Sequence, residues 1–369
     1  MHQCSTNLNT DIFSDECSEF HVGNTPRSII TKGNSVTLGT QYGNFIHGNK
    51  DKLMISYRRE PTHDYMMAGA CDVFYKGEIH FFGGKKLYNL TRQHFIIETD
   101  RGKYSPLAKM RQEKNLDLDF EYPSCLQMTR KIFGSWISKT FVMLCFGYFE
   151  KNACYSFNDK ENQLTLIGYS NVGHYKGGLQ TYQRHLLTVG NEDGRFGNKK
   201  TELNKNGDFN WTFVDKGFTF KTSEKSIGIS RHSMMTIRSS DINEEYIILI
   251  GGVDTVEYTK PDRYEWNELK NVFKFNGTWF SFGKLNEPRW DHSSIYWNGA
   301  VYVIGGQQPR EQDWNYSGSN QTGTKMEIWK INDSPYEFQT TVNWPELFNW
   351  RTPFLFIIPD SFSPYYVFQ

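Results

Sequence analysis

The chain of 369 residues carries 41 basic and 41 acidic side chains, so its formal net charge is zero. Because basic residues are not in excess, the composition gives no reason to expect nucleic acid or an anionic membrane as a partner. No apolar run reaches the roughly 20 residues that a membrane-spanning helix needs, and an aromatic content of 16% is typical of a protein built from many short strands.

The first 25 residues are polar, and we expect them to form a leader in front of one folded domain that spans residues 26–369. Strand character first appears within residues 40–60, at 43–47 and 53–57. Five copies of one pattern then occupy about residues 64–350. Within residues 351–369, the segments 354–358 and 365–368 again have the composition of strands.

In each copy a short apolar strand ends in glycine. The clear copies cover residues 79–84, 246–252 and 301–306, and two worn copies cover 141–147 and 186–190. We expect backbones to crowd where these strands end, because glycine is the residue that leaves room there. The glycines concerned are Gly83, Gly84, Gly147, Gly190, Gly251, Gly252, Gly305 and Gly306.

Four antiparallel strands are predicted for each copy. In the fifth copy the turn Asn298-Gly299 suits a tight hairpin between the first two strands. A pattern repeated at this spacing predicts an array of one supersecondary unit. The predicted strands are 67–75, 78–82, 95–99 and one near 104; 123–128, 140–146, 153–157 and 164–167; 178–183, 185–189, 200–204 and 211–214; 233–237, 246–250, 271–275 and 278–282; and 293–297, 301–304, 326–331 and 336–341.

These features resemble the Kelch family over about residues 64–350. The resemblance rests on the glycine doublets, on an aromatic residue that follows them at a distance (Tyr104, Trp211, Trp279), and on Arg289 and His292 ahead of the next strand. It implies an all-β, Kelch-type β-propeller in which each copy is a four-stranded blade. We expect six blades, the sixth composed of 40–60 and 351–369, because closure by both termini removes exposed sheet edges. Five blades with caps is the alternative.

The six cysteines contain no Cys-x-x-Cys pair, which argues against a structural zinc site. Extracellular disulfides and reduced buried thiols both remain open. Six glycosylation sequons favour an extracellular over a cytoplasmic location, although the first ten residues lack the apolar segment of a secretory signal. The cysteines available for disulfides are Cys4, Cys17, Cys71, Cys125, Cys145 and Cys154, with Cys4–Cys17 as one possible pair. The sequons are at Asn89, Asn210, Asn276, Asn315, Asn320 and Asn332.

No phosphate-binding loop, metalloprotease motif or nucleophile elbow occurs, so we expect no catalytic residues, no cofactor and no metal. His292 beside Asp291 resembles a catalytic pair, but we expect His292 and His232 to hydrogen-bond between blades. A copper-radical oxidase, which also uses Kelch-like blades, is the enzymatic alternative, with these two histidines as ligands. Its Cys–Tyr cross-link cannot readily form between Cys154 and Tyr155, because neighbours on a strand point to opposite faces.

The long loops that follow the glycine doublets should emerge on one rim and carry function. They are rich in Trp, Tyr and Arg, the residues that dominate interface energies. We therefore expect a non-enzymatic scaffold that binds an unidentified protein partner, with a structural role in an extracellular matrix as a further alternative; the oligomeric state stays open. The predicted binding residues are Arg195, Phe196, Tyr258, Arg263, Tyr264, Trp266, Arg310, Trp314 and Tyr316.

Overall fold

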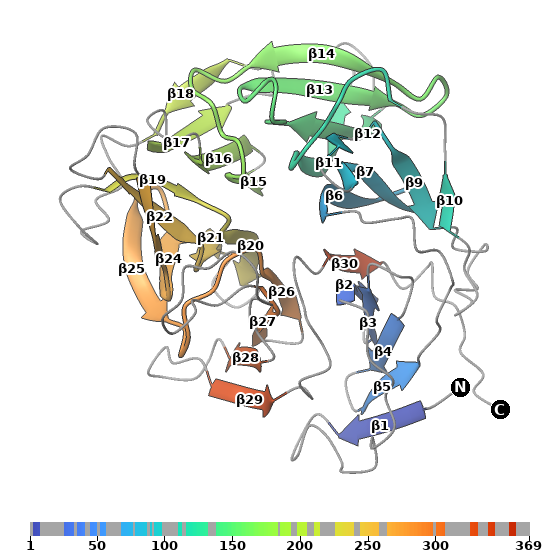
Figure 1. Ribbon diagram of the computed structural model, residues 1–369, viewed down its shortest axis with the longest axis vertical. Coiled ribbons are helices and arrows are strands. Elements are labelled where there is room, and N and C mark those ends of the chain that lie inside the picture. Colours follow the sequence, from blue (N-terminus) through green and yellow to red (C-terminus); the bar gives the residue numbers. More distant parts are fainter. Residues whose placement is uncertain are drawn as a thin grey trace.

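The computed structural model has an all-β, propeller-like fold in which several small antiparallel sheets stand around a common centre (Figure 1). The part of the chain that it describes contains strands and turns but no helix, and hence no helix there that could cross a membrane. The described residues are 3–7, 26–32, 35–40, 45–49, 52–56, 68–76, 78–86, 89–90, 92–97, 110–112, 116–131, 138–183, 185–192, 198–204, 210–214, 226–239, 244–257, 264–297, 300–306, 325–330, 339–343 and 354–358.

Five sheets follow the five predicted copies, and we number them 1 to 5 in chain order. Sheet 1 contains β6 (Ala68–Tyr75), β7 (Glu78–Lys86), β8 (Asn89–Leu90), β9 (His94–Ile97) and β10 (Met110–Gln112). Sheet 2 contains β11 (Ser124–Lys131), β12 (Ser138–Cys145), β13 (Ala153–Asn158) and β14 (Gln163–Tyr169). Sheet 3 contains β15 (Gly178–Tyr182), β16 (His185–Asn191), β17 (Asn198–Asn204) and β18 (Trp211–Phe213).

Sheet 4 contains β20 (Ser233–Ser239), β21 (Glu244–Ile250), β24 (Asn271–Phe275) and β25 (Trp279–Lys284). Sheet 5 contains β26 (Ser293–Trp297), β27 (Ala300–Ile304), β28 (Lys325–Lys330) and β29 (Gln339–Asn343). Most predicted strands are confirmed to within a few residues. The fourth strand of the first copy is an error, since it was expected near residue 104 and lies at Met110–Gln112 instead.

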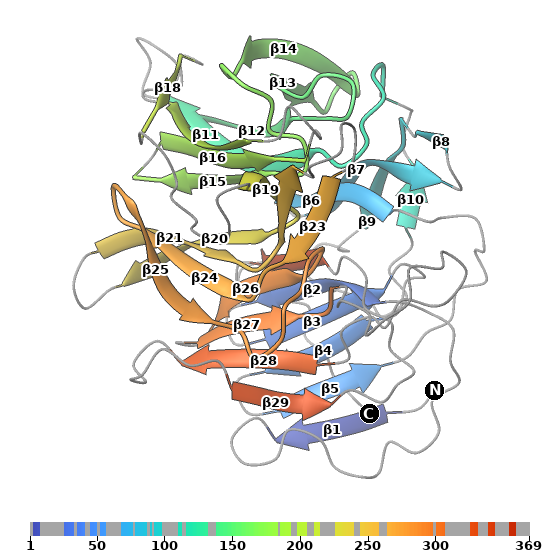
Figure 2. The ribbon, with the colours of Figure 1, turned by 60° about the vertical axis from the view of Figure 1, so that its left-hand side comes forward.

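Both ends of the chain contribute to one further sheet, in the order β1-β5-β4-β3-β2-β30. Figure 2 shows β2, β3, β4, β5 and β1 following one another. β30 (Phe354–Ile358) pairs in parallel with β2 (Pro26–Lys32), with Ile30 opposite Phe356. β4 (Phe45–Asn49) and β5 (Lys52–Ser56) correspond to predicted strands, whereas β3 (Ser35–Thr40) was not foreseen. β1 (Gln3–Asn7) pairs with β5 although it lies in the segment predicted as a leader. Residues 365–368 lie outside the described residues.

A three-stranded sheet, β19-β22-β23, has no counterpart in the prediction. It joins β19 (Ser226–Ser230) to the hairpin of β22 (Val253–Glu257) and β23 (Tyr264–Glu268). The segment after Gly252, predicted as a long loop, is therefore partly a hairpin. The β-branched residues Val253, Thr255 and Val256 favour the extended backbone found there.

The first strands of sheets 1 to 5 lie near the centre (Figure 1), and those of successive sheets contact one another. β30 contacts both β6 and β26. Between the sheets lie apolar layers, such as Phe82 with Leu144 between sheets 1 and 2, and Ile248 with Val303 between sheets 4 and 5. Burial of these side chains supplies the main free energy of packing.

The first glycine position of a copy lies under the backbone of the entry segment, by which we mean the residues that lead into the following sheet. A Cβ atom on Gly83 would come within 2.1 Å of the Phe120 carbonyl oxygen, and one on Gly190 would come within 2.1 Å of the Ile229 carbonyl oxygen. Both glycines also have a positive φ. Only glycine satisfies the space and the backbone conformation together, which accounts for the recurrence of this residue.

Candidate functional site

Four residues occupy the same place in successive sheets, two positions before the first strand. They are Tyr122, Lys176, Arg231 and Asp291, and we call them the lead-in residues. Each has a left-handed backbone with φ of 52°, 54°, 53° and 52° respectively, which is uncommon for residues other than glycine. The Arg231 amide donates to the Lys176 carbonyl oxygen at 2.8 Å, and the Asp291 amide donates to the Arg231 carbonyl oxygen at 3.0 Å. Backbone bonds thus link neighbouring lead-in residues.

The four lead-in residues line one pocket of about 260 Å³, together with Asp72 from β6. We call it the axial pocket, because its walls come from the places where the first strands of sheets 1 to 5 begin. Strained backbone conformations tend to persist where a structure positions functional side chains, so this pocket is the candidate functional site.

Two cations and two carboxylates form a connected network beside the pocket. Lys176 Nζ lies 2.7 Å from Glu192 Oε1, and Arg231 donates to Glu192 and, at 3.1 Å, to Asp291 Oδ2. Burial alone would raise the pKa of Glu192, but pairing with Arg231 and Lys176 lowers it. Burial lowers the pKa of Lys176 and raises that of Asp291 despite their partners. The network therefore balances its own charge.

A series of aromatic rings extends from the axial pocket to the surface of the protein. Lys176 Nζ lies 4.4 Å from the centre of the Tyr122 ring and 5.0 Å from that of Tyr175. Tyr175 in turn lies 5.5 Å from Tyr148, which contacts Phe149 at 5.3 Å. Tyr148 is 44% exposed and Phe149 is 61% exposed. We call Tyr122, Tyr148, Phe149 and Tyr175 the aromatic rim cluster.

A repeated contact holds each lead-in residue in place. The residue two positions before it, the anchor, meets one position on the third strand of the following sheet. That third-strand position lies opposite the second-strand residue two places before the first glycine position, which Phe146 occupies in sheet 2. Phe120 meets Tyr155, His174 meets Glu202 and Arg289 meets Glu327, whereas the anchor Ile229 lies in a core cluster that also contains Phe273.

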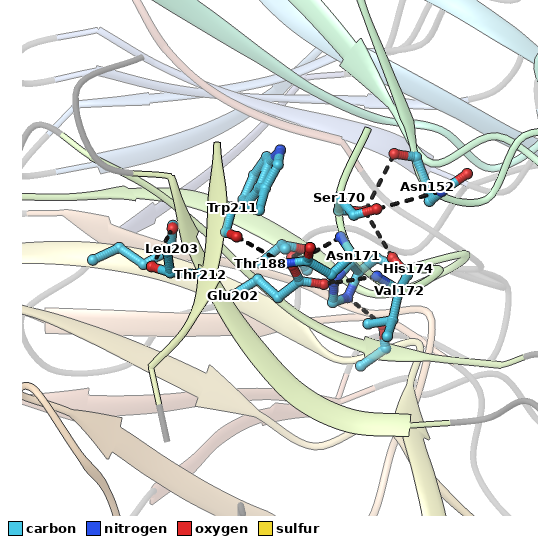
Figure 3. A network of polar contacts seen from close by, with 12 residues as sticks. Asn152, Ser170, Asn171, Val172, His174, Thr188, Glu202, Leu203, Trp211 and Thr212 are labelled. Atoms are coloured by element: carbon cyan, nitrogen blue, oxygen red, sulfur yellow. Dashed lines mark hydrogen bonds and ion pairs between the residues drawn. The ribbon is translucent and has the colours of Figure 1, made fainter. Parts of the chain in front are cut away.

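Figure 3 shows the anchor contact of sheet 3, where Glu202 binds the segment that leads to Lys176. Glu202 accepts hydrogen bonds from the Asn171 amide at 3.0 Å, the Asn171 side chain at 2.7 Å and the Val172 amide at 3.0 Å. His174 Nε2 lies 3.1 Å from Glu202 Oε1, with both side chains fully buried. Burial would raise the pKa of Glu202, but these hydrogen bonds lower it.

The anchor contact of sheet 5 uses a full ion pair. Arg289 Nη2 donates to Glu327 Oε1 at 2.6 Å, again with both side chains fully buried. Arg289 Nη1 donates to the Gly305 carbonyl oxygen at 3.0 Å, and the Asn286 amide donates to Glu327 at 2.6 Å. The arginine singled out by the repeat pattern therefore fixes the segment that ends at Asp291.

The two histidines of the repeat pattern lie between sheets. A Cβ atom on Gly190 would come within 3.1 Å of the His232 ring, and one on Gly251 within 2.9 Å of the His292 ring. The expected hydrogen bonds are not found: neither ring has a well-formed partner among the described residues. Burial lowers the pKa of His232 to about 3 and that of His292 well below its usual range, so both rings are neutral near pH 7.

Four of the candidate cysteines form two disulfides, Cys71 with Cys125 and Cys145 with Cys154. Cys154 is thus not a free thiol for a cross-link to tyrosine. Cys17 lies outside the described residues, so its pairing with Cys4 is not described. The described residues contain no group of three or more His, Cys, Asp or Glu side chains arranged to hold a metal ion.

None of the predicted binding residues lines the axial pocket, and only two of them lie in the described part of the chain. Tyr264 and Trp266 lie on β23, and Gly147 is followed at once by the exposed Tyr148 and Phe149. The predicted binding residues come from the long loops that follow three other copies. The same search after Gly147, in a worn copy, would have found Tyr148 and Phe149. The remaining predicted binding residues, Arg195, Phe196, Tyr258, Arg263, Arg310, Trp314 and Tyr316, lie outside the described residues.

Comparisons with known proteins support the fold alone. No family model matches the chain, and no curated protein matches it. Among solved structures, the structure of YjhT resembles it with a TM-score of 0.59 at 14% sequence identity, covering 87% of this chain and 97% of that one. The likeness extends over nearly the whole of both chains, so the two share an architecture.

Proposed function

We propose that the chain is a Kelch-type β-propeller of six blades, with a ring closed by both termini. The pairing of β30 with β2 supports this proposal, as do the contacts of β30 with β6 and β26. The repeated fit of entry-segment carbonyl groups over glycines supports a common blade design.

On this scaffold, the protein acts without catalysis and binds another protein through one rim. The aromatic rim cluster is the observation that carries this function. Phe149 and Tyr148 are exposed large rings supported from below by Tyr175, and rigid, partly exposed aromatic residues are typical anchors of protein interfaces.

The order of the strands supports an extension of this surface by the predicted loops. Tyr148 follows the end of β12, the second strand of sheet 2, and the loops after Gly190, Gly252 and Gly306 follow the second strands of sheets 3, 4 and 5. Their aromatic and arginine residues would therefore extend the surface that begins at Phe149.

An extracellular location fits the two disulfides, which are typical of oxidising compartments. The surface is thus available to a secreted or cell-surface partner. Reduction of both disulfides should lower the thermal stability of the protein, which can be measured by calorimetry with and without a reductant.

Quantitative capture of secreted proteins tests the rim function. Wild type is compared with Tyr148→Ala/Phe149→Ala and with Phe280→Ala, which removes a 45% exposed ring from the outer strand β25. We expect one or more proteins to bind wild type and Phe280→Ala, and to lose about tenfold or more in affinity for the double variant. Equal capture by all three would defeat the rim assignment.

A further inference from the structure

Some charged side chains of the axial pocket have protein partners and one does not. The cations Lys176 and Arg231 donate to Glu192, and Arg231 donates also to Asp291. Asp72 lines the same pocket and is partly buried, yet its carboxyl group has no ion pair or hydrogen bond in the part of the chain that the structure describes. A carboxyl group of perturbed pKa that lies in a pocket and has no protein partner among the described residues is a candidate for ligand binding.

Two histidines of the pocket lining add no positive charge to it. His232 and His292 are more than nine-tenths buried, and burial lowers the pKa of both rings and keeps them neutral near pH 7. Burial raises the pKa of Asp72 well above its usual range, so a cation next to it would relieve an unfavourable charge.

We propose that the axial pocket binds an ammonium group, with Asp72 as its counter-ion. Lys176 and Arg231 would repel such a ligand if they were uncompensated, but Glu192 and Asp291 balance their charges. A volume of about 260 Å³ suits a group the size of a side chain. The ammonium group comes either from a free amine or from a lysine side chain of a rim partner.

Calorimetric titration with butylammonium tests the site, with butanol as the neutral ligand of similar shape. We expect saturable binding of butylammonium, weaker binding of butanol by about tenfold or more, and the same loss for butylammonium in Asp72→Asn. Phe280→Ala, which changes a remote ring, should bind as wild type does. No binding to wild type, or equal affinity in Asp72→Asn, would overturn the proposal.

A second measurement needs no variant and so does not depend on how Asp72→Asn folds. Amide chemical shifts of the wild-type protein should change on addition of butylammonium at Asp72, Ser124 and Ser293, all of which line the pocket. Changes confined to other parts of the molecule would contradict the assignment.

A peptide arm separates the two sources of the ligand. If acetyl-Gly-Lys-Gly-amide binds and its Nε-acetylated counterpart does not, the pocket takes a lysine side chain; if only butylammonium binds, it takes a free amine. Both results support the site. The inference stands apart from the rim function, because Tyr148→Ala/Phe149→Ala should leave butylammonium affinity unchanged even where it abolishes capture of a protein partner.

Discussion

The four anchor contacts do one task with two kinds of chemistry. In sheets 3 and 5 a fully buried glutamate meets a basic side chain, His174 or Arg289. In sheet 2 the rings of Phe120 and Tyr155 meet at 5.5 Å, and in sheet 4 the anchor is Ile229, in a core cluster that also contains Phe273.

The comparison shows that a repeat position is specified by the pair and not by one residue. Each anchor is matched to its partner in polarity, since a buried charge without a partner would be costly. In sheet 4, where the pair is apolar, β19 leads directly into Arg231 and pairs with β22. The entry segment of sheet 4, whose anchor is the aliphatic Ile229, therefore has an additional sheet beside it.

The largest effect is expected from removing one member of the ion pair. Arg289→Ile leaves the charge of Glu327 buried and should cost about 3 to 5 kcal/mol of unfolding free energy. The double variant Arg289→Ile/Glu327→Phe copies the apolar pair of sheet 4 and should recover most of that loss. Urea unfolding of the wild type and both variants decides; a double variant as unstable as the single one would contradict the matched-pair account.

Glycine substitutions ask whether the carbonyl packing is common to both kinds of contact. Gly190 lies under the carbonyl group of the apolar anchor Ile229, and Gly251 under that of the polar anchor Arg289. Alanine at either glycine should lower the free energy of unfolding by at least about 1 to 3 kcal/mol, because its backbone would be strained and its Cβ atom would clash with the carbonyl group above it. Gly277→Ala, which has a positive φ but nothing within 4 Å, should cost only about 1 kcal/mol. A loss at Gly190 or Gly251 no larger than at Gly277 would count against the packing.

His174→Phe should lower the free energy of unfolding by about 1 to 3 kcal/mol, which is less than the loss expected for Arg289→Ile. Glu202 keeps its hydrogen bonds from Asn171 and Val172, so the carboxylate stays partly satisfied. Thermal or urea unfolding compares the two variants directly. If His174→Phe were the more damaging, the hydrogen bonds that remain to each glutamate would not explain the difference between the two contacts.

Glu202 should also contribute a small dependence of stability on pH. Its pKa is lowered in the folded state, so it stabilises the fold above the unfolded-state pKa of about 4.3, and this contribution is lost as the pH falls through the folded-state value. Glu202→Gln should therefore lose less stability than wild type on acidification below that pH. Parallel unfolding curves at several pH values test this; identical slopes would contradict it.

Much of the strand pattern could be predicted from the sequence, because apolar runs that end in glycine have a local signature. The strand at 271–275 was predicted with its observed bounds. The anchor pairs could not be predicted, because pairing His174 with Glu202 requires the register of β16 and β17. The left-handed conformation of Tyr122 or Lys176 has no local signal either, since it is imposed by the packing of neighbouring entry segments. Ring closure and blade number stay predictions.

Hydrogen exchange of the entry segments tests most directly whether the anchor contacts position the rim. Mass spectrometry follows the peptides that cover residues 171–177 and 286–292 in wild type, Glu202→Gln and Glu327→Gln. The account predicts slow exchange at the amides of Asn171, Val172 and Asn286, which donate to the two glutamates, and faster exchange in each variant confined to its own segment. Rapid exchange of both segments in the wild type would contradict it.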